Sequence, residues 1–118
     1  MKPICYDFTV VRGNNQPITF RFKTGAVGET EPLDLSYGEI VLTVASRLGV
    51  LRKSTNDADG LAVEPLSGEV TWLPTLGESR AIPEGRLSAY EIEWRRTDGR
   101  QLTLLRGAIT GVGGIADD

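Results

Sequence analysis

The sequence predicts an all-β protein, an antiparallel sandwich of about seven to eight short strands. Apolar and polar residues alternate along most of the chain, which is the pattern of strands with one buried and one solvated face. The strand candidates follow one another at short spacing, and no amphipathic helix separates them. A parallel α/β sheet would therefore lack its crossover helices, and a small closed Greek-key barrel is the alternative to the sandwich.

Length and composition indicate one ordinary domain. The chain has 118 residues, of which 40% are hydrophobic and 25% charged, so it can bury a core and is not expected to be disordered. We expect the sandwich to occupy residues 1–110. Residues 111–118 are rich in glycine and end in two acidic residues, which predicts a flexible tail.

The first half of the chain contains four strand candidates. They share the period-two alternation and span residues 6–11, 18–22, 40–44 and 50–53. Turn-forming residues at 13–17 join the first two, which predicts either a hairpin or a corner between sheets. A polar loop over 25–36 precedes the third candidate.

The second half contains four more candidates. They span residues 61–63, 70–72, 90–94 and 101–109. The polar segment 54–60 that precedes them is the clearest surface loop of the chain, and a turn at 65–68 separates the first two. Residues 75–82, bracketed by two prolines, could form one helical turn, but their number and their glycine argue against a real helix.

The last hairpin has the strongest local signal, because its register can be deduced. A two-residue loop at Asp98-Gly99 would set Trp94 opposite the polar Thr103. A three-residue loop at 97–99, with Gly99 in the left-handed conformation, keeps apolar residues opposite each other and is preferred. The pairs that it predicts are Trp94–Leu102, Ile92–Leu104, Arg95–Gln101 and Glu93–Thr103.

Charge and cysteine content narrow the possible partners and the compartment. The 13 basic and 16 acidic residues are interleaved, so nothing indicates a surface for nucleic acid or an anionic membrane. The pairs Arg52-Lys53 and Arg95-Arg96 fit solvated strand faces. Cys5 is the only cysteine, so we expect no disulfide within the chain and place Cys5 in the core as a small apolar residue. We expect a cytoplasmic protein, since no secretory signal or membrane-spanning run is evident.

Residues for catalysis or metal binding are scarce. The chain has no histidine, which removes the usual general base and most zinc or copper sites. Glu91 and Glu93 have the spacing of paired carboxylates on one strand face, yet they fit a solvent face better. The segment Asp57-Ala58-Asp59-Gly60 lacks the rest of a calcium loop, and no helix follows Gly111-Val112-Gly113-Gly114 as a phosphate-binding loop requires. We predict no enzymatic activity, no site residues and no cofactor.

Several short motifs follow one another along nearly the whole chain. They are Val11-Arg12-Gly13, the strand at 18–22, Pro-Leu-Asp-Leu-Ser at 32–36, Pro83-Glu84-Gly85, the hairpin at 90–94 with Asp98-Gly99, and Leu104-Leu105-Arg106-Gly107. This order resembles the N-terminal domain of the baseplate upper proteins of tailed bacteriophages, which are often encoded in prophages. The resemblance implies an immunoglobulin-like (Ig-like) sandwich with a structural, non-catalytic role in a phage tail or baseplate, and it implies no functional residues.

Two functional hypotheses follow. The first is a tail or baseplate protein, made in the bacterial cytoplasm and carried in the virion, that binds itself as a homo-oligomer and other virion proteins. Its first strand, residues 6–11, carries one charge, Asp7, and no proline, so an exposed edge there predicts self-association. The alternative is an Ig-like module that presents loops or aromatic residues to a glycan or another ligand. Trp72 and Trp94 are in phase with apolar neighbours, so we expect both in the core.

Overall fold

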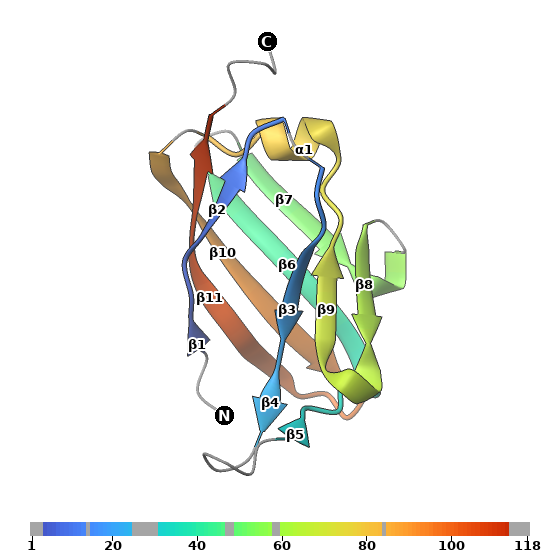
Figure 1. Cartoon of the computed structure of the whole chain (residues 1–118). Helices are drawn as coiled ribbons and strands as arrows, with labels where there is room; N and C mark the ends of the chain where they lie inside the picture. The colour runs from blue at the N-terminus through green and yellow to red at the C-terminus, as the bar shows by residue number, and fades with distance from the viewer. Residues whose placement is uncertain are drawn as a thin grey trace.

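A computed structural model describes residues 4–13, 15–24, 31–46, 49–57, 60–83 and 85–113. These residues form two stacked β-sheets, which confirms the predicted all-β sandwich over the barrel alternative (Figure 1). Sheet A consists, in spatial order, of β1 (Ile4–Cys5) and β2 (Phe8–Val11) on one edge, then β11 (Gln101–Val112), β10 (Gly85–Arg96), β6 (Gly38–Ser46) and β7 (Gly49–Ser54). Sheet B consists of β3 (Ile18–Arg21), β9 (Glu69–Trp72) and β8 (Leu61–Glu64).

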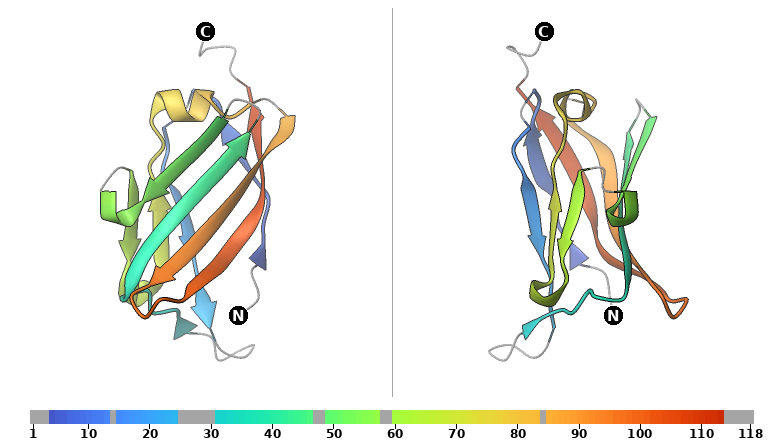
Figure 2. Two further views of the ribbon diagram at one scale, coloured as in Figure 1. Left: turned by 180° about the vertical axis from the view of Figure 1, so that it is seen from behind. Right: turned by 90° about the vertical axis from the view of Figure 1, so that its right-hand side faces the viewer.

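Short elements connect the strands, and several of them lie at the two ends of the sandwich. They are the pair β4 (Lys23–Thr24) and β5 (Glu31–Pro32), the 3₁₀ turns η1 (Thr55–Asp57) and η2 (Pro65–Ser67), and the helix α1 (Leu76–Arg80). Figure 2 shows α1 across one end of the two layers and the β4–β5 pair at the other. Among the described residues, no helix is long and apolar enough to cross a lipid bilayer.

The strand order is that of a variable-type Ig sandwich. β3, β9 and β8 occupy the positions of strands B, E and D, and β11, β10, β6 and β7 those of G, F, C and C′. The first strands differ, because β1 and β2 lie parallel to β11 in sheet A and not beside β3 in sheet B. As a result, β3 is an edge strand.

The core between the sheets is apolar and aromatic. Trp72 and Trp94 are 0% and 5% exposed, which confirms their predicted place. Antibody domains join strands B and F by a disulfide, whereas here Phe20 of β3 and Tyr90 of β10 stack with their ring centroids 6.3 Å apart. Phe8 packs edge-on against Tyr90, at 4.9 Å, so an aromatic cluster joins the two sheets.

The last hairpin confirms most of its predicted register. Gly99 has a φ of 91°, and three of the four expected pairs are present, among them Trp94–Leu102. The fourth prediction is wrong, since Ile92 lies opposite Leu105 and not Leu104. A register shift between Ile92 and Glu93 sets two residues of β11 against one of β10, as in a β-bulge. As a result, Leu104 and Leu105 are both buried.

The first strand prediction needs correction. Residues 6–11 form no single strand, because β1 ends at Cys5 and β2 begins at Phe8. The chain between β2 and β3 crosses from sheet A to sheet B, so the corner is correct and the hairpin is wrong. Cys5 is exposed and not in the core, because it lies on a two-residue strand at the edge of sheet A.

Two further predictions fail at α1. Residues 76–80 form a helix despite their small number, because Thr75 and Glu78 make a capping box in which the side chain of each accepts the backbone N–H of the other, at 3.1 and 2.9 Å. Lys53 is buried and not solvated, since it turns toward α1 and forms an ion pair with Glu78. Its neighbour Arg52 is exposed as expected.

The C-terminal boundary also lies further along the chain than expected. β11 continues to Val112, and Gly111 is buried against Pro83, whose carbonyl oxygen would lie 2.5 Å from a Cβ at that position. The first two residues of the span 111–118 therefore belong to the sheet. Residues 114–118 lie outside the described residues.

Candidate functional site: an open side of the sandwich

The candidate catalytic and metal-binding residues do not come together. The described residues contain no group of three or more carboxylates, cysteines or histidines able to hold a metal ion. Glu91 is exposed, and Glu93 accepts a 2.7 Å hydrogen bond from Arg95, so this pair lies on the solvated face of β10. Residues 58 and 59 of the segment 57–60, and the residue at 114, fall outside the described residues.

The free sheet edges lie along two sides of the molecule. Figure 1 shows β1 and β2 at the left of sheet A and β8 at the right of sheet B. β7 is the opposite edge of sheet A from β1 and β2, and the free edge of β3 faces the same way as the edge of β2. We call these the β7–β8 side and the β2–β3 side. Unpaired N–H and C=O groups on such edges invite another strand unless the sequence blocks them, so the two sides can be compared as binding surfaces.

The β7–β8 side is protected. Lys53 points inward from the edge strand β7 and pairs with Glu78, and their side chains are only 8% and 14% exposed. An inward-pointing charge on an edge strand disfavours strand addition, because a pairing partner would have to tolerate it. β8 is four residues long and runs directly into η2, which Ser67 Oγ closes by donating to the Glu64 carbonyl at 3.3 Å.

The edge of β2 on the β2–β3 side lacks this protection. β2 contains neither a proline nor a charged residue. The backbone N–H of Arg12 donates to the carbonyl of Val112 in β11 at 3.0 Å. Because backbone groups alternate in direction along a strand, Phe8 and Val10 also bond toward β11. The N–H and C=O groups of Thr9 and Val11 therefore face away from the sheet.

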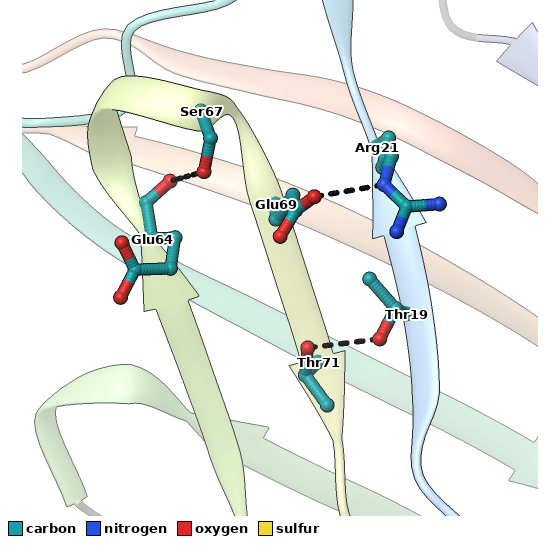
Figure 3. Close-up of polar contacts among 6 residues, drawn as sticks. All are labelled: Thr19, Arg21, Glu64, Ser67, Glu69 and Thr71. Carbon is teal, nitrogen blue, oxygen red and sulfur yellow. Dashed lines mark hydrogen bonds and ion pairs between the residues drawn. The ribbon is translucent and has the colours of Figure 1, made fainter.

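The edge of β3 is open in the same way. The backbone N–H of Phe22 donates to the Gly68 carbonyl at 2.8 Å. The backbone groups of the even-numbered residues of β3 therefore bond toward β9, and the backbone groups of Thr19 and Arg21 face away from β9. Figure 3 shows the side chains of these two residues reaching β9, where the Thr19 and Thr71 hydroxyls lie 3.1 Å apart and Arg21 Nε donates to Glu69 at 2.8 Å.

An apolar hollow lies between these two edges. It has a volume of about 270 Å³ and is lined by Tyr6, Thr19, Phe20, Arg21, Phe22 and Leu105. A second hollow of about 120 Å³ continues along the same side between β2 and the start of β3. Tyr6 is 54% exposed, and Val11 and Val112 are exposed as well, so this side of the sandwich is both unpaired and apolar.

A kink between β1 and β2 sets the position of Tyr6. The Tyr6 N–H still donates to Arg106 in β11, at 2.9 Å, but its carbonyl turns inward and accepts a 2.5 Å hydrogen bond from the Tyr90 hydroxyl. The Asp7 carboxylate takes over as acceptor for the N–H of Ala108, at 2.9 Å. Burial, reinforced by the negative charge of Asp7, raises the pKa of Tyr90.

Gly107 makes this kink possible. A Cβ at this position would lie 2.0 Å from the carbonyl oxygen of Tyr6, far inside contact distance. The closing glycine of the motif at 104–107 thus has a structural reason, because only a residue without a side chain lets the kinked strand approach β11 so closely.

A hollow of greater volume lies elsewhere, between α1 and the β6–β7 hairpin. It measures about 370 Å³, and Val44, Leu51 and Ile82 form its apolar part. Glu78 also lines it, but one carboxylate oxygen of Glu78 accepts the Thr75 N–H and the other contacts Lys53. The acidic group in this wall is thus already occupied by neighbours within the chain.

Comparison with known proteins adds little to this geometry. No protein-family model and no curated protein matches the chain. Among solved structures, extracellular domains 3–5 of Drosophila OTK show a TM-score of 0.38 and 9% sequence identity over 93% of this chain and 33% of that one. The chain thus spans about a third of that structure's length, and the fold assignment rests on the strand order described above.

Proposed function

We propose that the protein is a non-enzymatic assembly module that binds copies of itself through the free edge of β2. The observation that carries this proposal is the contrast between the two sides of the sandwich. Lys53 protects the β7–β8 side, whereas β2 offers unblocked backbone groups beside the exposed Tyr6. Addition of a strand to such an edge would satisfy those groups and bury apolar surface.

The resemblance to baseplate upper proteins supports a place for this module in the tail or baseplate of a phage or prophage, after synthesis in the bacterial cytoplasm. Two of its motifs have structural roles that suit a rigid building block. In the first, Arg12 Nη2 donates to the Arg80 carbonyl at 3.1 Å and the Gly13 N–H to Ser79 Oγ at 3.0 Å, which ties the end of β2 to α1. In the second, Asp34 accepts the backbone N–H of Ser36 at 2.9 Å in a turn at the opposite end.

Light scattering over a range of concentrations tests the assembly. We expect a mass above that of one chain, and Thr9→Pro should lower it with little change in melting temperature, because the Thr9 N–H faces away from β11. Val10→Pro is the matched control, since the Val10 N–H faces β11 and its loss should destabilise the fold. A mass of one chain at every concentration would contradict the proposal.

A ligand-binding module is the second candidate, and the hollow of about 370 Å³ beside α1 is the observation that favours it. Both tryptophans are buried, so neither offers a stacking platform for a sugar in this structure. Titration of the ¹⁵N-labelled protein with a panel of oligosaccharides would support this function if shifts concentrated at Ser46, Val50 and Gly77. Unchanged spectra would leave the assembly proposal as the better one.

A further inference from the structure

We propose that the free edge of β3 is the surface that receives β2 of a second copy, so that two chains form a dimer in which β2 of each pairs with β3 of the other. This inference rests on the proposed function and specifies the partner edge. It follows from the direction of the two strands, the orientation of their backbone groups, and the apolar hollow between them.

The directions of the strands allow the pairing to be reciprocal. β2 and β3 lie on the same side of the molecule, in different layers, and run in opposite directions (Figure 1). Consider a two-fold axis that runs parallel to the strands next to this side. Rotation about it places sheet A of the partner in the layer of sheet B and keeps the direction of each strand. The partner's β2 then extends sheet B and runs antiparallel to β3. The same rotation brings the partner's β3 beside β2. Such an interface uses the same surface of both copies and closes as a dimer.

The backbone groups of the two edges match where Thr9 is set opposite Thr19, although Val11 then faces Pro17, which has no N–H to donate. On β2 the outward-facing groups belong to Thr9 and Val11, and on β3 to Thr19 and Arg21. In an antiparallel ladder, residues that exchange both hydrogen bonds lie directly opposite each other and point their side chains to the same face. Thr9, Thr19 and Arg21 are exposed on the outer faces, so pairing Thr9 with Thr19 keeps Phe8, Val10, Ile18 and Phe20 directed inward, while Val11 stays on the outer face with Thr9.

One register also matches the side chains. With the partner's Thr9 opposite Thr19, the partner's Phe8 lies opposite Phe20 and the partner's Val10 opposite Ile18, so apolar residues meet. The same register sets the partner's Asp7 opposite Arg21. Within each chain the Asp7 carboxylate already accepts the N–H of Ala108 and Arg21 donates to Glu69, so the apolar pairs determine this register.

Burial favours the same arrangement. The hollow of about 270 Å³ has Tyr6 at its rim and Phe20, Phe22 and Leu105 among its lining residues. A strand added at β3 would cover it, and the exposed apolar area of Tyr6 would be removed from water in both copies. The β7–β8 side has a hollow of its own beside β7, but there the buried Lys53–Glu78 pair disfavours the addition of a strand.

Disulfide trapping tests the contact. In a Cys5→Ser background, Thr9→Cys and Thr19→Cys are made in separate chains, one of them carrying a tag that changes its mass. Directly opposed residues of an antiparallel pair are within disulfide reach. We expect mild oxidation of the mixture to give a covalent dimer with one chain of each kind, at least tenfold more abundant than any dimer from either variant alone. In the matched control, Thr9→Cys is mixed with Arg52→Cys, on β7, in place of Thr19→Cys. This mixture should give no covalent dimer.

The other outcomes separate this inference from the proposed function. A covalent dimer of Thr9→Cys with itself would overturn the inference, because it would place β2 against β2, but it would leave self-assembly intact. An oligomer in light scattering without any of these disulfides would likewise overturn it and place the contact elsewhere. A single-chain mass in light scattering would overturn both. Each variant is first compared with the Cys5→Ser protein by thermal melting, so that only folded chains are scored.

Discussion

The Tyr90 hydroxyl donates a 2.5 Å hydrogen bond to the backbone carbonyl of Tyr6, 84 positions away in the sequence. The bond joins the aromatic cluster of the core to the kink between β1 and β2. Because the carbonyl of Tyr6 turns inward to accept it, the Asp7 carboxylate replaces that carbonyl in the ladder with β11. This arrangement divides the edge strand and leaves the ring of Tyr6 at the rim of the apolar hollow.

Replacing Tyr90 by Phe should lower the free energy of unfolding at pH 7 by about 1 kcal/mol, since one hydrogen bond is lost while the ring packing is kept. Urea unfolding followed by tryptophan fluorescence measures the change. Tyr37→Phe is the control, because Tyr37 is highly exposed and its hydroxyl should contribute nothing measurable. Equal stability of Tyr90→Phe and the parent would show that the bond to Tyr6 does not stabilise the fold.

The same pair should depend on pH in a defined direction. Burial raises the pKa of Tyr90, whereas in the unfolded chain the phenol titrates near pH 10. The contribution of Tyr90 to stability is therefore complete below about pH 10 and decreases as the pH rises further, by up to about 1.4 kcal/mol per pH unit. The difference between the parent and Tyr90→Phe should narrow above pH 10. A constant difference from pH 7 to 11 would contradict the pKa shift.

Gly107→Ala should destabilise the protein by about 2 kcal/mol or more, because the added methyl group meets the backbone of Tyr6 and not a movable side chain. Gly77→Ala is the matched control. The nearest atom to a Cβ at Gly77 is 3.9 Å away, and alanine in α1 should stabilise by roughly 0.5–1 kcal/mol. Chemical unfolding of both variants checks the contrast, and similar losses in the two would argue against the close approach at Gly107.

Lys53→Met should cost roughly 3–5 kcal/mol, the usual effect of leaving one partner of a buried ion pair without the other. The double variant Lys53→Met, Glu78→Gln should recover part of that loss, since no unpaired charge remains. A double-mutant cycle by urea unfolding measures the coupling, and Arg52→Met, one residue away and exposed, should change stability little. Additive losses in the cycle would show that the two groups are independent.

Gly99→Val should lower stability by about 1–3 kcal/mol through backbone strain alone. No atom lies within 4 Å of a Cβ at Gly99, but its φ of 91° is one that β-branched residues avoid. Gly99→Asn should cost less, because asparagine tolerates the left-handed region. If the valine and asparagine variants melt at the same temperature, the positive φ is not what constrains this turn.

Local patterns were sufficient for much of the fold. Alternation of apolar residues located most of the strands, and opposition of like residues predicted the bulged turn at Gly99 and the pair Trp94–Leu102. The capping box of Thr75 and Glu78 was also present in the sequence, as the pattern Thr-x-x-Glu. The prediction against a helix rested on the small number of residues and on the glycine of the segment, and the capping box outweighs both in the structure.

Other features depend on segments that are distant in the sequence. The burial of Lys53 could not be predicted, because Glu78 comes from another element and reaches β7 only after both sheets have formed. The register shift that pairs Ile92 with Leu105 also has no turn residue that would predict it. Likewise the exposure of Cys5 follows from the position of β1 at a sheet edge and not from its own neighbours.

The sequence by itself determined most of the strands and the last turn of this protein, since strand periodicity and turn chemistry act between residues that are close along the chain. The tertiary structure alone decided which edges remain open. The edge of β3 is free because β1 and β2 pair with β11 in sheet A and not with β3. Gly107, Asp7 and Tyr90 together stabilise this pairing. These contacts exist only when the two ends of the chain meet, so no local pattern records them, and with them comes the surface that we propose for assembly.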